Sequence, residues 1–283
     1  MTPSMRTATV NDMGLILDWA AAEGWNPGLD DAATFHAADP DGFFVAEDET
    51  GLVAAISVVN HSYSFAFLGL YLCRPDRRGR GIGLALWQHA LAHAGDRIVG
   101  LDGVAAQQGN YARSGFALVG STTRLVGPVA EPVGDAPRLR AATPADIAPL
   151  AALDAEANGV DRPRFITAWL TQTGSRRTVV MDGPDGPVGF ATARLCRTDC
   201  KVGPVVAPDA SAARDLAHTA ARSIGATRCI IDLPSGTEPL RSLLETEGFS
   251  ETFATARMYR TGQGGEAPTA SPRLFATATL ELG

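Results

Sequence analysis

One turn constrains this chain more than any other segment. An apolar run typical of a β-strand leads into residues 74–83 (RPDRRGRGIG), and a helical pattern follows at once. The N-terminus of a helix presents free backbone N–H groups to anions, and the helix dipole adds to the attraction. Glycines let the backbone approach a phosphate closely, and the arginines add positive charge. The segment therefore predicts a pyrophosphate cradle.

Three phosphate-binding motifs can be compared with this turn. A Walker loop ends in Gly-Lys-Ser/Thr, whereas Ile82-Gly83-Leu84 stands here. A dinucleotide fingerprint follows the first strand of its domain, but several predicted strands precede this turn. The pattern Arg-x-x-Gly-x-Gly is matched at every position by residues 78–83. An ordinary glycine-rich connection between a strand and a helix is the simpler alternative.

Two motifs together resemble a known family. With Pro75 three residues ahead, the Arg-x-x-Gly-x-Gly motif is similar to the acetyl-CoA loop of the GNAT superfamily of N-acetyltransferases. Tyr111, which precedes Gly115-Phe116 by four residues, resembles a second GNAT signature. The resemblance covers roughly residues 5–126. It implies a mixed sheet flanked by helices, with acetyl-CoA as the cofactor.

Composition and charge narrow the class of protein. The chain has 283 residues, 45% of them hydrophobic and 19% charged, which is typical of a soluble globular protein large enough for two domains. A net charge of −7 argues against a nucleic-acid partner. The sequence contains neither an apolar run of about 18 residues nor a signal-peptide pattern, so we expect a cytoplasmic protein with no membrane partner. The four cysteines are expected to be free thiols, and no metal site is expected.

The chain contains one pattern twice. Residues 6–12 return as residues 140–146, 134 positions later (140 − 6), and both copies read as a strand followed by a Thr-x-x-Asp helix cap. Gly115-Phe116 likewise returns as Gly248-Phe249. We therefore expect a catalytic domain over residues 1–127, a Pro/Gly-rich linker over 128–137 and a second domain over 138–283.

The second copy lacks the cradle. Three positions of the first copy, Arg78, Gly81 and Gly83, correspond to Ser211, Arg214 and Leu216 in the second. Tyr111 corresponds to Leu244. The second domain is therefore expected to be GNAT-like but degenerate. The whole chain resembles a bacterial tandem-GNAT group in which an active N-terminal domain precedes a degenerate one.

The fold class is predicted as α/β (α+β), with two tandem GNAT-like domains, each a mixed, mostly antiparallel sheet flanked by helices. In the first copy the pattern predicts strands at 5–9, 42–47, 52–60, 63–73 and 97–102, helices at 11–23, 30–38, 81–95 and about 107–114, and a hairpin at 116–126. A final strand-like run covers residues 273–282.

The resemblance implies a set of cofactor-binding residues: Leu72, Cys73, Arg78, Gly79, Arg80, Gly81, Ile82, Gly83 and Asn110. The first two would act through backbone groups that hold pantetheine, and an N–H there could polarise the acetyl carbonyl. The Cys73 thiol need not be a nucleophile. The role of Asn110 is the weakest of these assignments, because the family asparagine often stands earlier in its helix.

The catalytic groups are less completely defined. A phenol of pKa about 10 suits Tyr111 as the proton donor to the leaving thiolate, although a tyrosine that only packs in the core is the alternative. Residues 64–73 contain no carboxylate, so the general base is chosen among Glu23, Asp102, His61 and a water chain. Asp102 has a counterpart, Asp232, in the second copy, and this favours a structural role at least as strongly.

Four residues are expected at the acceptor site. Trp25 and Asn26 stand in a turn after the first helix, and Arg257 and Tyr259 of the second copy would reach the junction between the domains, a common place for ligands. The sequence predicts an N-acetyltransferase, monomeric or homodimeric, that acts on a small-molecule or peptide amine. The alternative is a non-catalytic acyl-CoA-binding sensor.

Overall fold

Both halves of the chain use the same order of helices and strands. The computed structural model describes residues 3–131, 139–262 and 265–283. The first half contains β1 (Ser4–Thr7), α1 (Val10–Ala22), α2 (Asp31–Ala38), β2 (Phe43–Asp48), β3 (Gly51–Asn60), β4 (Phe65–Cys73), α3 (Ile82–Leu91), β5 (Ile98–Gly103), α4 (Gln108–Arg113) and β6 (Ala117–Pro128). The second contains β7 (Leu139–Ala141), α5 (Ile147–Asn158), α6 (Pro163–Leu170), β8 (Arg176–Gly183), β9 (Gly186–Leu195), β10 (Cys200–Val206), α7 (Ala210–Ser223), β11 (Arg228–Pro234), α8 (Glu238–Thr246) and β12 (Ser250–Arg260), followed by β13 (Leu274–Ala276).

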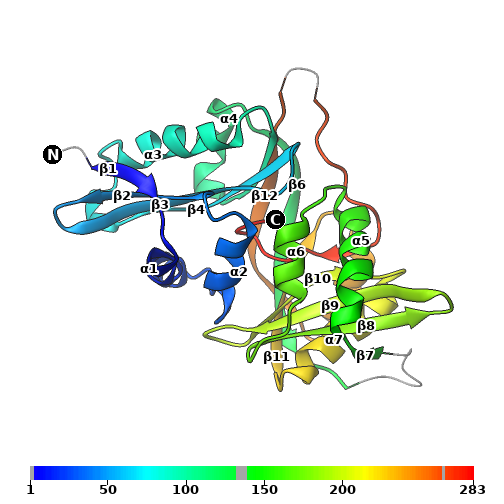
Figure 1. Cartoon of the computed structure of the whole chain (residues 1–283). Coiled ribbons are helices and arrows are strands. Elements are labelled where there is room, and N and C mark those ends of the chain that lie inside the picture. Colours follow the sequence, from blue (N-terminus) through cyan, green and yellow to red (C-terminus); the bar gives the residue numbers. More distant parts are fainter. Residues whose placement is uncertain (1–2, 132–138, 263–264) are drawn as a thin grey trace.

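The strands form one continuous sheet. Its order is β1-β2-β3-β4-β5-β12-β6-β11-β10-β9-β8-β7, and β13 pairs with β10 off this path. The pairs β4–β5 and β10–β11 are parallel, and the other described pairs are antiparallel. The sheet of each half is therefore mixed and mostly antiparallel, as the sequence predicts. Figure 1 shows the two halves at opposite ends of the molecule, joined by the long strands β6 and β12.

The last strand of each half pairs with the other half. β12 lies between β5 and β6, and β6 lies between β12 and β11. The hairpin predicted over residues 116–126 is therefore wrong, because this segment is part of a single strand of 12 residues. Both partners of that strand come from the second half of the chain, so the segment has no need to fold back on itself.

Two matching ion pairs fix this exchange. Arg257 of β12 stands opposite Asp102 of β5, with Nη2 and Oδ2 2.7 Å apart, and Arg124 of β6 stands opposite Asp232 of β11, with Nε and Oδ1 2.7 Å apart. Both arginines bind their carboxylate through two nitrogens. Removing one partner of a buried pair costs about 3–5 kcal/mol, so these pairs strongly favour the observed strand register.

The repeated helix starts are confirmed. Thr9 and Asp12 form a capping box before α1, and Thr143 and Asp146 form the same box before the helix of the second half. Arg6 binds the first of these aspartates, and the corresponding arginine of the second half binds the other, in both cases at 2.7 Å. The repeated residues therefore form the same helix cap and the same arginine–aspartate ion pair in both halves.

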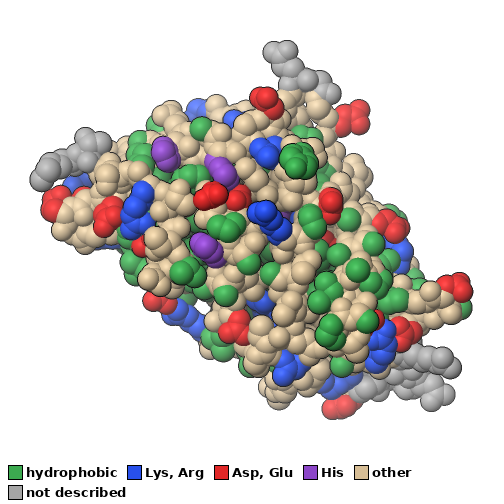
Figure 2. All heavy atoms as spheres, viewed as in Figure 1, with side chains coloured by type: hydrophobic (Ala, Val, Ile, Leu, Met, Phe, Trp, Pro, Cys, Tyr) green, Lys and Arg blue, Asp and Glu red, His purple; other side chains and the backbone are tan. Residues whose placement is uncertain are grey.

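The helices cover both faces of the sheet and join the halves. In Figure 1, α1 and α2 lie on one face of the first sheet segment, and α3 and α4 lie on the other. Helix α2 packs against α6 of the second half, where Phe35 and Trp169 stack with ring centroids 6.4 Å apart. On the face shown in Figure 2, acidic and basic side chains are interspersed and do not gather into one basic patch.

Two sequence expectations concern connecting segments. The strand predicted over residues 273–282 is reduced to β13, and residues 277–283 continue as a buried segment between the halves. Most of the linker predicted over 128–137 falls on residues 132–138, which lie outside the described residues.

None of the described helices is long and apolar enough to cross a membrane.

Candidate active site

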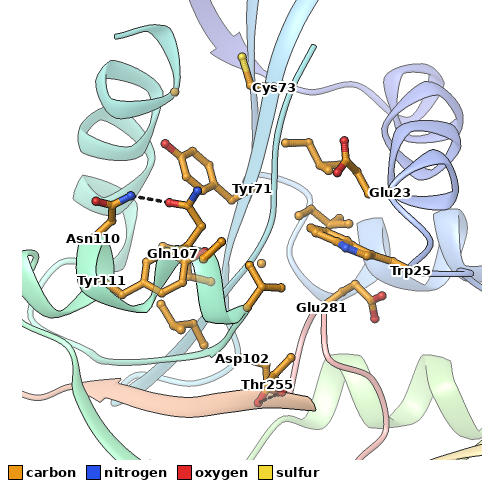
Figure 3. Close-up of a pocket in the computed structure, with 18 of the residues that line it drawn as sticks. Glu23, Trp25, Tyr71, Cys73, Asp102, Gln107, Asn110, Tyr111, Thr255 and Glu281 are labelled. Atoms are coloured by element: carbon orange, nitrogen blue, oxygen red, sulfur yellow. Dashed lines mark hydrogen bonds between the residues drawn. The ribbon is translucent and has the colours of Figure 1, made fainter. Parts of the chain in front are cut away.

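A cavity of about 550 Å³ opens where β4 and β5 diverge. The two strands pair only from Phe65 to Leu68 of β4, opposite Ile98 to Leu101 of β5, and beyond Leu68 β4 pairs with β3 alone. The volume lies within the range of roughly 300–1,000 Å³ that is usual for small-molecule sites. Figure 3 shows Tyr71, Gln107, Asn110 and Tyr111 on one side of the cavity. The other side carries Glu23, Trp25 and Glu281.

A bulge in β4 shapes the cavity wall. Leu72 pairs with Ala55 of β3 but Gly69 pairs with Ser57, so β4 contains one extra residue there. Leu70, inside the bulge, has a φ of +46°, a left-handed conformation that is uncommon for a residue with a side chain. Bulges redirect side chains and end strand pairing. This one stands at the point where β4 separates from β5.

The start of α3 fits an anion. Gly81 is the N-cap, with a φ of +78°, and it makes no side-chain cap hydrogen bond. Gly79 has a φ of +74°, and at both glycines the position of a missing Cβ has no other atom within 4 Å. The backbone at Gly79 and Gly81, just before the helix, therefore borders open space that a side chain would enter. This arrangement has the geometry and charge that a pyrophosphate requires.

The arginines of the loop take different positions. Arg77 binds Asp48 of β2 at 2.9 Å. Arg78 lines the cavity, where its Nε donates to the carbonyl of Cys73 at 3.0 Å and its Nη2 contacts the Glu23 carboxylate. Arg80 is exposed and lies outside the lining. Arg77 and Arg78 both line the cavity, so these two loop arginines bring positive charge to it.

The other predicted cofactor residues line this cavity, with Arg80 the exception: Leu72, Cys73, Arg78, Gly79, Gly81, Ile82, Gly83 and Asn110. Burial raises the pKa of the Cys73 thiol, which keeps it protonated and argues against a role as nucleophile. Asn110 donates from Nδ2 to Oε1 of Gln107 at 2.5 Å, the contact drawn in Figure 3.

Two tyrosines face the cavity. Tyr111 is buried on α4 and stacks on Trp87 of α3, with ring centroids 5.4 Å apart. Burial raises its pKa well above the usual value, so the hydroxyl keeps its proton near neutral pH and is a weaker acid than a free phenol. Tyr71 meets the same tryptophan edge-on, also at 5.4 Å. The sequence analysis missed Tyr71 because it lies within a strand and belongs to no motif.

The three side chains considered as the base lie in different surroundings. Glu23 lines the cavity and binds Arg78. Asp102 also lines it, but its side chain is buried against Arg257; burial raises its pKa while that guanidinium opposes the shift. His61 is outside the lining, and its Nε2 donates to the carbonyl of Leu282 at 2.7 Å. Burial lowers the pKa of His61 to about 4.

Of the residues predicted at the acceptor site, the structure places Trp25 in the cavity wall. Asn26 instead donates from Nδ2 to the carbonyl of Thr198, at 2.8 Å. Arg257 and Tyr259 are outside the lining, the first paired with Asp102 and the second packed against aromatic rings of β4. The second half reaches the cavity with other residues: Phe253, Thr255, Leu280 and Glu281.

Sequence comparisons identify the family. A model of the acetyltransferase (GNAT) family matches residues 11–116, and a model of an acetyltransferase (GNAT) domain matches residues 150–276. The chain is 32% identical over 283 residues to holothin acyltransferase of Pseudoalteromonas sp. (strain SANK 73390), covering 100% of this chain and 95% of that protein. The chain therefore belongs to the GNAT acyltransferases, enzymes that generally take their acyl group from an acyl-CoA.

Solved structures share the two-domain fold. A putative acetyltransferase from Pyrococcus horikoshii matches with a TM-score of 0.81 and 18% identity, covering 100% of this chain and 96% of that one. A tandem GNAT protein from the clavulanic acid biosynthesis pathway matches with a TM-score of 0.65 and 18% identity, covering 94% and 100%. These matches define the chain as a tandem GNAT protein in fold.

Proposed function

We propose that this chain is an N-acetyltransferase that moves an acetyl group from acetyl-CoA directly to a primary amine of a small molecule or peptide. The observation that carries the proposal is the arrangement of one cavity. The open, glycine-lined start of α3 lies at this cavity, and a protonated Tyr111 hydroxyl lines it. Acyl transfer needs both an anion site for the cofactor and a proton donor for the leaving thiolate.

We assign the chemistry to residues 1–127 and regard residues 138–283 as a degenerate GNAT-like domain. The first half contains the glycine-rich cradle and Tyr111. The second half has Arg214 and Leu216 in place of the glycines, Ser211 in place of Arg78 and Leu244 in place of Tyr111. The second half still contributes to the cavity wall through β12 and residues 277–283.

When bound, acetyl-CoA supplies the activated acetyl thioester. In this scheme the first N–H groups of α3 and the Arg78 guanidinium hold the pyrophosphate. Backbone groups of Leu72 and Cys73, beyond the β4 bulge, hold the pantetheine arm and polarise the acyl carbonyl. As the acceptor nitrogen bonds to the acyl carbon and the C–S bond breaks, Glu23 or a water chain would take the proton that the nitrogen loses, and Tyr111 would donate its phenolic proton to the departing sulfur and regain one from solvent. The free edge of β4 supports this scheme, because the strand no longer pairs with β5 there.

A small-molecule acceptor is favoured over a peptide. The relative that is 32% identical over the whole chain is named for holothin, and the cavity has the volume of a small-molecule site. Holothin is therefore the first acceptor to test. Of the two cavity carboxylates considered as the base, Glu23 is partly exposed, whereas Asp102 is committed to a buried ion pair. We therefore favour a structural role for Asp102.

The test is thiol release from acetyl-CoA in the presence of an amine panel: holothin, benzylamine, a polyamine and a short peptide with a free N-terminus. We expect release with at least one small amine, and none with the Gly81→Arg variant. Acetyl-CoA binding without release across the panel would instead support the non-catalytic sensor. The Tyr111 hydroxyl in the cavity argues against that alternative.

A further inference from the structure

Residues 277–283 form a fixed part of the cavity wall. In Figure 1 the C-terminal end of the described chain lies in the middle of the molecule, beside β12. The backbone N–H of Thr277 donates to the backbone carbonyl of Asp232 at 3.0 Å, and Arg194 donates to the carbonyl of Ala278 at 2.7 Å. At Gly69 of β4, a Cβ would lie 2.0 Å from the carbonyl oxygen of Glu281. This close contact sets the position of Glu281 against β4.

Glu281 brings an unusual carboxylate to the cavity. The residue is only 4% exposed, yet it lines the cavity on the same side as Trp25 (Figure 3). The hydroxyl of Thr279 donates to its Oε2. A carboxylate has about four positions that accept hydrogen bonds, so most of its capacity is unused. Burying a charge with so few hydrogen bonds is costly, and a ligand that donates to it would recover part of that cost.

Glu281 differs from the other two carboxylates of the cavity. Glu23 contacts Arg78, and Asp102 is bound by Arg257. Within the described part of the chain, no basic nitrogen lies within 4.0 Å of Glu281. Its charge acts over longer distances on three buried cations that have nearer partners: Arg124 with Asp232 at 2.7 Å, Arg194 with Asp31 at 3.3 Å and Lys201 with the carbonyl of Trp25 at 2.7 Å.

Apolar side chains lie around this carboxylate, together with Arg124, whose guanidinium is bound by Asp232. Trp25 lies on the same side, and Leu280, the neighbour of Glu281, also lines the cavity, as does Phe253 of β12. A ligand that suits these surroundings combines an apolar body with one cationic, hydrogen-bond-donating group. A primary ammonium on a small apolar molecule has this chemistry, whereas a neutral alcohol or an anion does not.

Building on the proposed function, we infer that Glu281 is the anionic anchor for the amino group of the acceptor. The carboxylate accepts hydrogen bonds from the acceptor's nitrogen and holds it in the cavity that Tyr111 lines. The second half of the chain thus supplies the group that selects an amine. This role differs from the one expected for Arg257 and Tyr259, whose side chains lie outside the cavity lining.

The experiment compares two probes of the same shape on the full chain. Benzylamine is a cation at pH 7, and benzyl alcohol is neutral. In calorimetry, Glu281→Gln should weaken benzylamine binding about 10-fold, the size of a lost charge-assisted hydrogen bond, and leave benzyl alcohol binding unchanged. For whichever amine the wild type acetylates best, KM should rise to a similar degree, with acetyl-CoA affinity within about 2-fold. Equal benzylamine affinity in both proteins would overturn the inference.

Two further variants keep the test decisive. Glu23→Gln removes another cavity carboxylate and should preserve the preference for benzylamine over benzyl alcohol; loss of the preference in this variant would assign the anchor to Glu23 and overturn the inference. If Glu281→Gln fails to fold, Glu281→Asp retains the charge and should retain the preference. The two proposals fail separately: absence of thiol release with every amine contradicts the proposed function, whereas the probe comparison tests Glu281 without turnover.

Discussion

Helices α3 and α7 occupy equivalent places in the order of elements but begin at different positions of the repeat. At α3 the N-cap is Gly81, and no side chain caps the free N–H groups. At α7 the N-cap is Asp209, whose carboxylate accepts from the N–H of Ala212 at 2.8 Å. Asp209 corresponds to Asp76 of the first half, so Ser211, Arg214 and Leu216, the counterparts of the cradle residues, already lie inside α7. Helix α3 thus lacks an N-cap side chain, which typically stabilises a helix by about 1 kcal/mol, and the space before it stays open.

The same contrast extends to the side chains that follow. In the second half, Leu216 is fully buried in the core, and Arg214 binds Glu247. Leu244, the counterpart of Tyr111, is also fully buried. Each replacement improves packing or pairing within α7 and α8 and removes a group that the proposed reaction needs. If the proposed function is correct, a few substitutions and an earlier helix start distinguish a cofactor-binding half from a half that binds none.

The largest expected effect comes from transferring one of these differences. Gly81→Arg, which copies Arg214 of the second half, should abolish acetyl-CoA binding, with at least about a 100-fold loss of affinity. It fills the open space before α3 and strains a φ of +78°. Calorimetry measures the affinity, and an unchanged melting transition serves as the folding control. Wild-type affinity in this variant would place the cofactor elsewhere.

A related measurement concerns stoichiometry. We expect one acetyl-CoA per chain in the wild type and none in Gly81→Arg, since the second half should bind none. The full chain is needed for this test, because β6 lies between β11 and β12 and a fragment of residues 138–283 would lack this central strand. A second equivalent of bound cofactor would contradict the assignment of a degenerate domain.

Tyr111→Phe should lower kcat by about 10²–10⁴-fold while leaving acetyl-CoA affinity nearly intact, because only the proton for the leaving sulfur is lost. Tyr71→Phe is the matched control, since Tyr71 also contacts Trp87 and faces the same cavity. We expect a much smaller effect from it. Steady-state kinetics at saturating substrates distinguish the two variants. Full turnover in Tyr111→Phe would leave that tyrosine a packing role only.

The paired variants Asp102→Asn and Asp232→Asn test whether the two halves are joined symmetrically. Each leaves a buried arginine without its carboxylate, so each should lower the free energy of unfolding by about 3–5 kcal/mol. Urea denaturation measures the loss. If Asp102→Asn is stable but its turnover falls below that of Asp232→Asn, Asp102 again becomes a candidate for the base.

The smallest effect is expected at Arg80. This arginine is exposed and outside the cavity lining, so Arg80→Ala should weaken acetyl-CoA binding only a few-fold, through charge that salt screens. Arg78→Ala should weaken it more, because Arg78 lines the cavity. Titrations at low and high salt separate the two contributions. A larger loss at Arg80 would mean that the phosphates lie further out along the loop.

Local signals in the sequence predicted the parts of the molecule that short-range geometry determines. The Thr-x-x-Asp caps, the glycine-rich start of α3 and Tyr111 before Gly115-Phe116 each act within one turn or helix, so spacing alone reveals them. The side chain of Asp102 was harder to interpret. Its repeat in the second half suggested a structural role, but its partner, Arg257, lies 155 positions away.

Pairing across the molecule was beyond the sequence patterns. Alternation of residues in 116–126 indicates a strand, yet it does not say which strands lie beside it, and the predicted hairpin was wrong for this reason. Glu281 belongs to no motif, and it becomes part of the cavity only because residues 277–283 pass beside Gly69. Arg257 was expected to face ligand, whereas the register of β12 directs it to Asp102.

The exchange of β6 and β12 has a consequence for how this protein forms during synthesis. When β5 leaves the ribosome, its neighbour β12 is still about 150 residues away, roughly 7–30 s of translation at ordinary rates. Throughout that interval one edge of the nascent sheet has no partner, and such edges invite aggregation. The yield of folded protein should therefore depend on how long this edge stays unpaired during synthesis. Slow codons between β5 and β12 lengthen that interval, and a chaperone that covers the edge protects the chain during it.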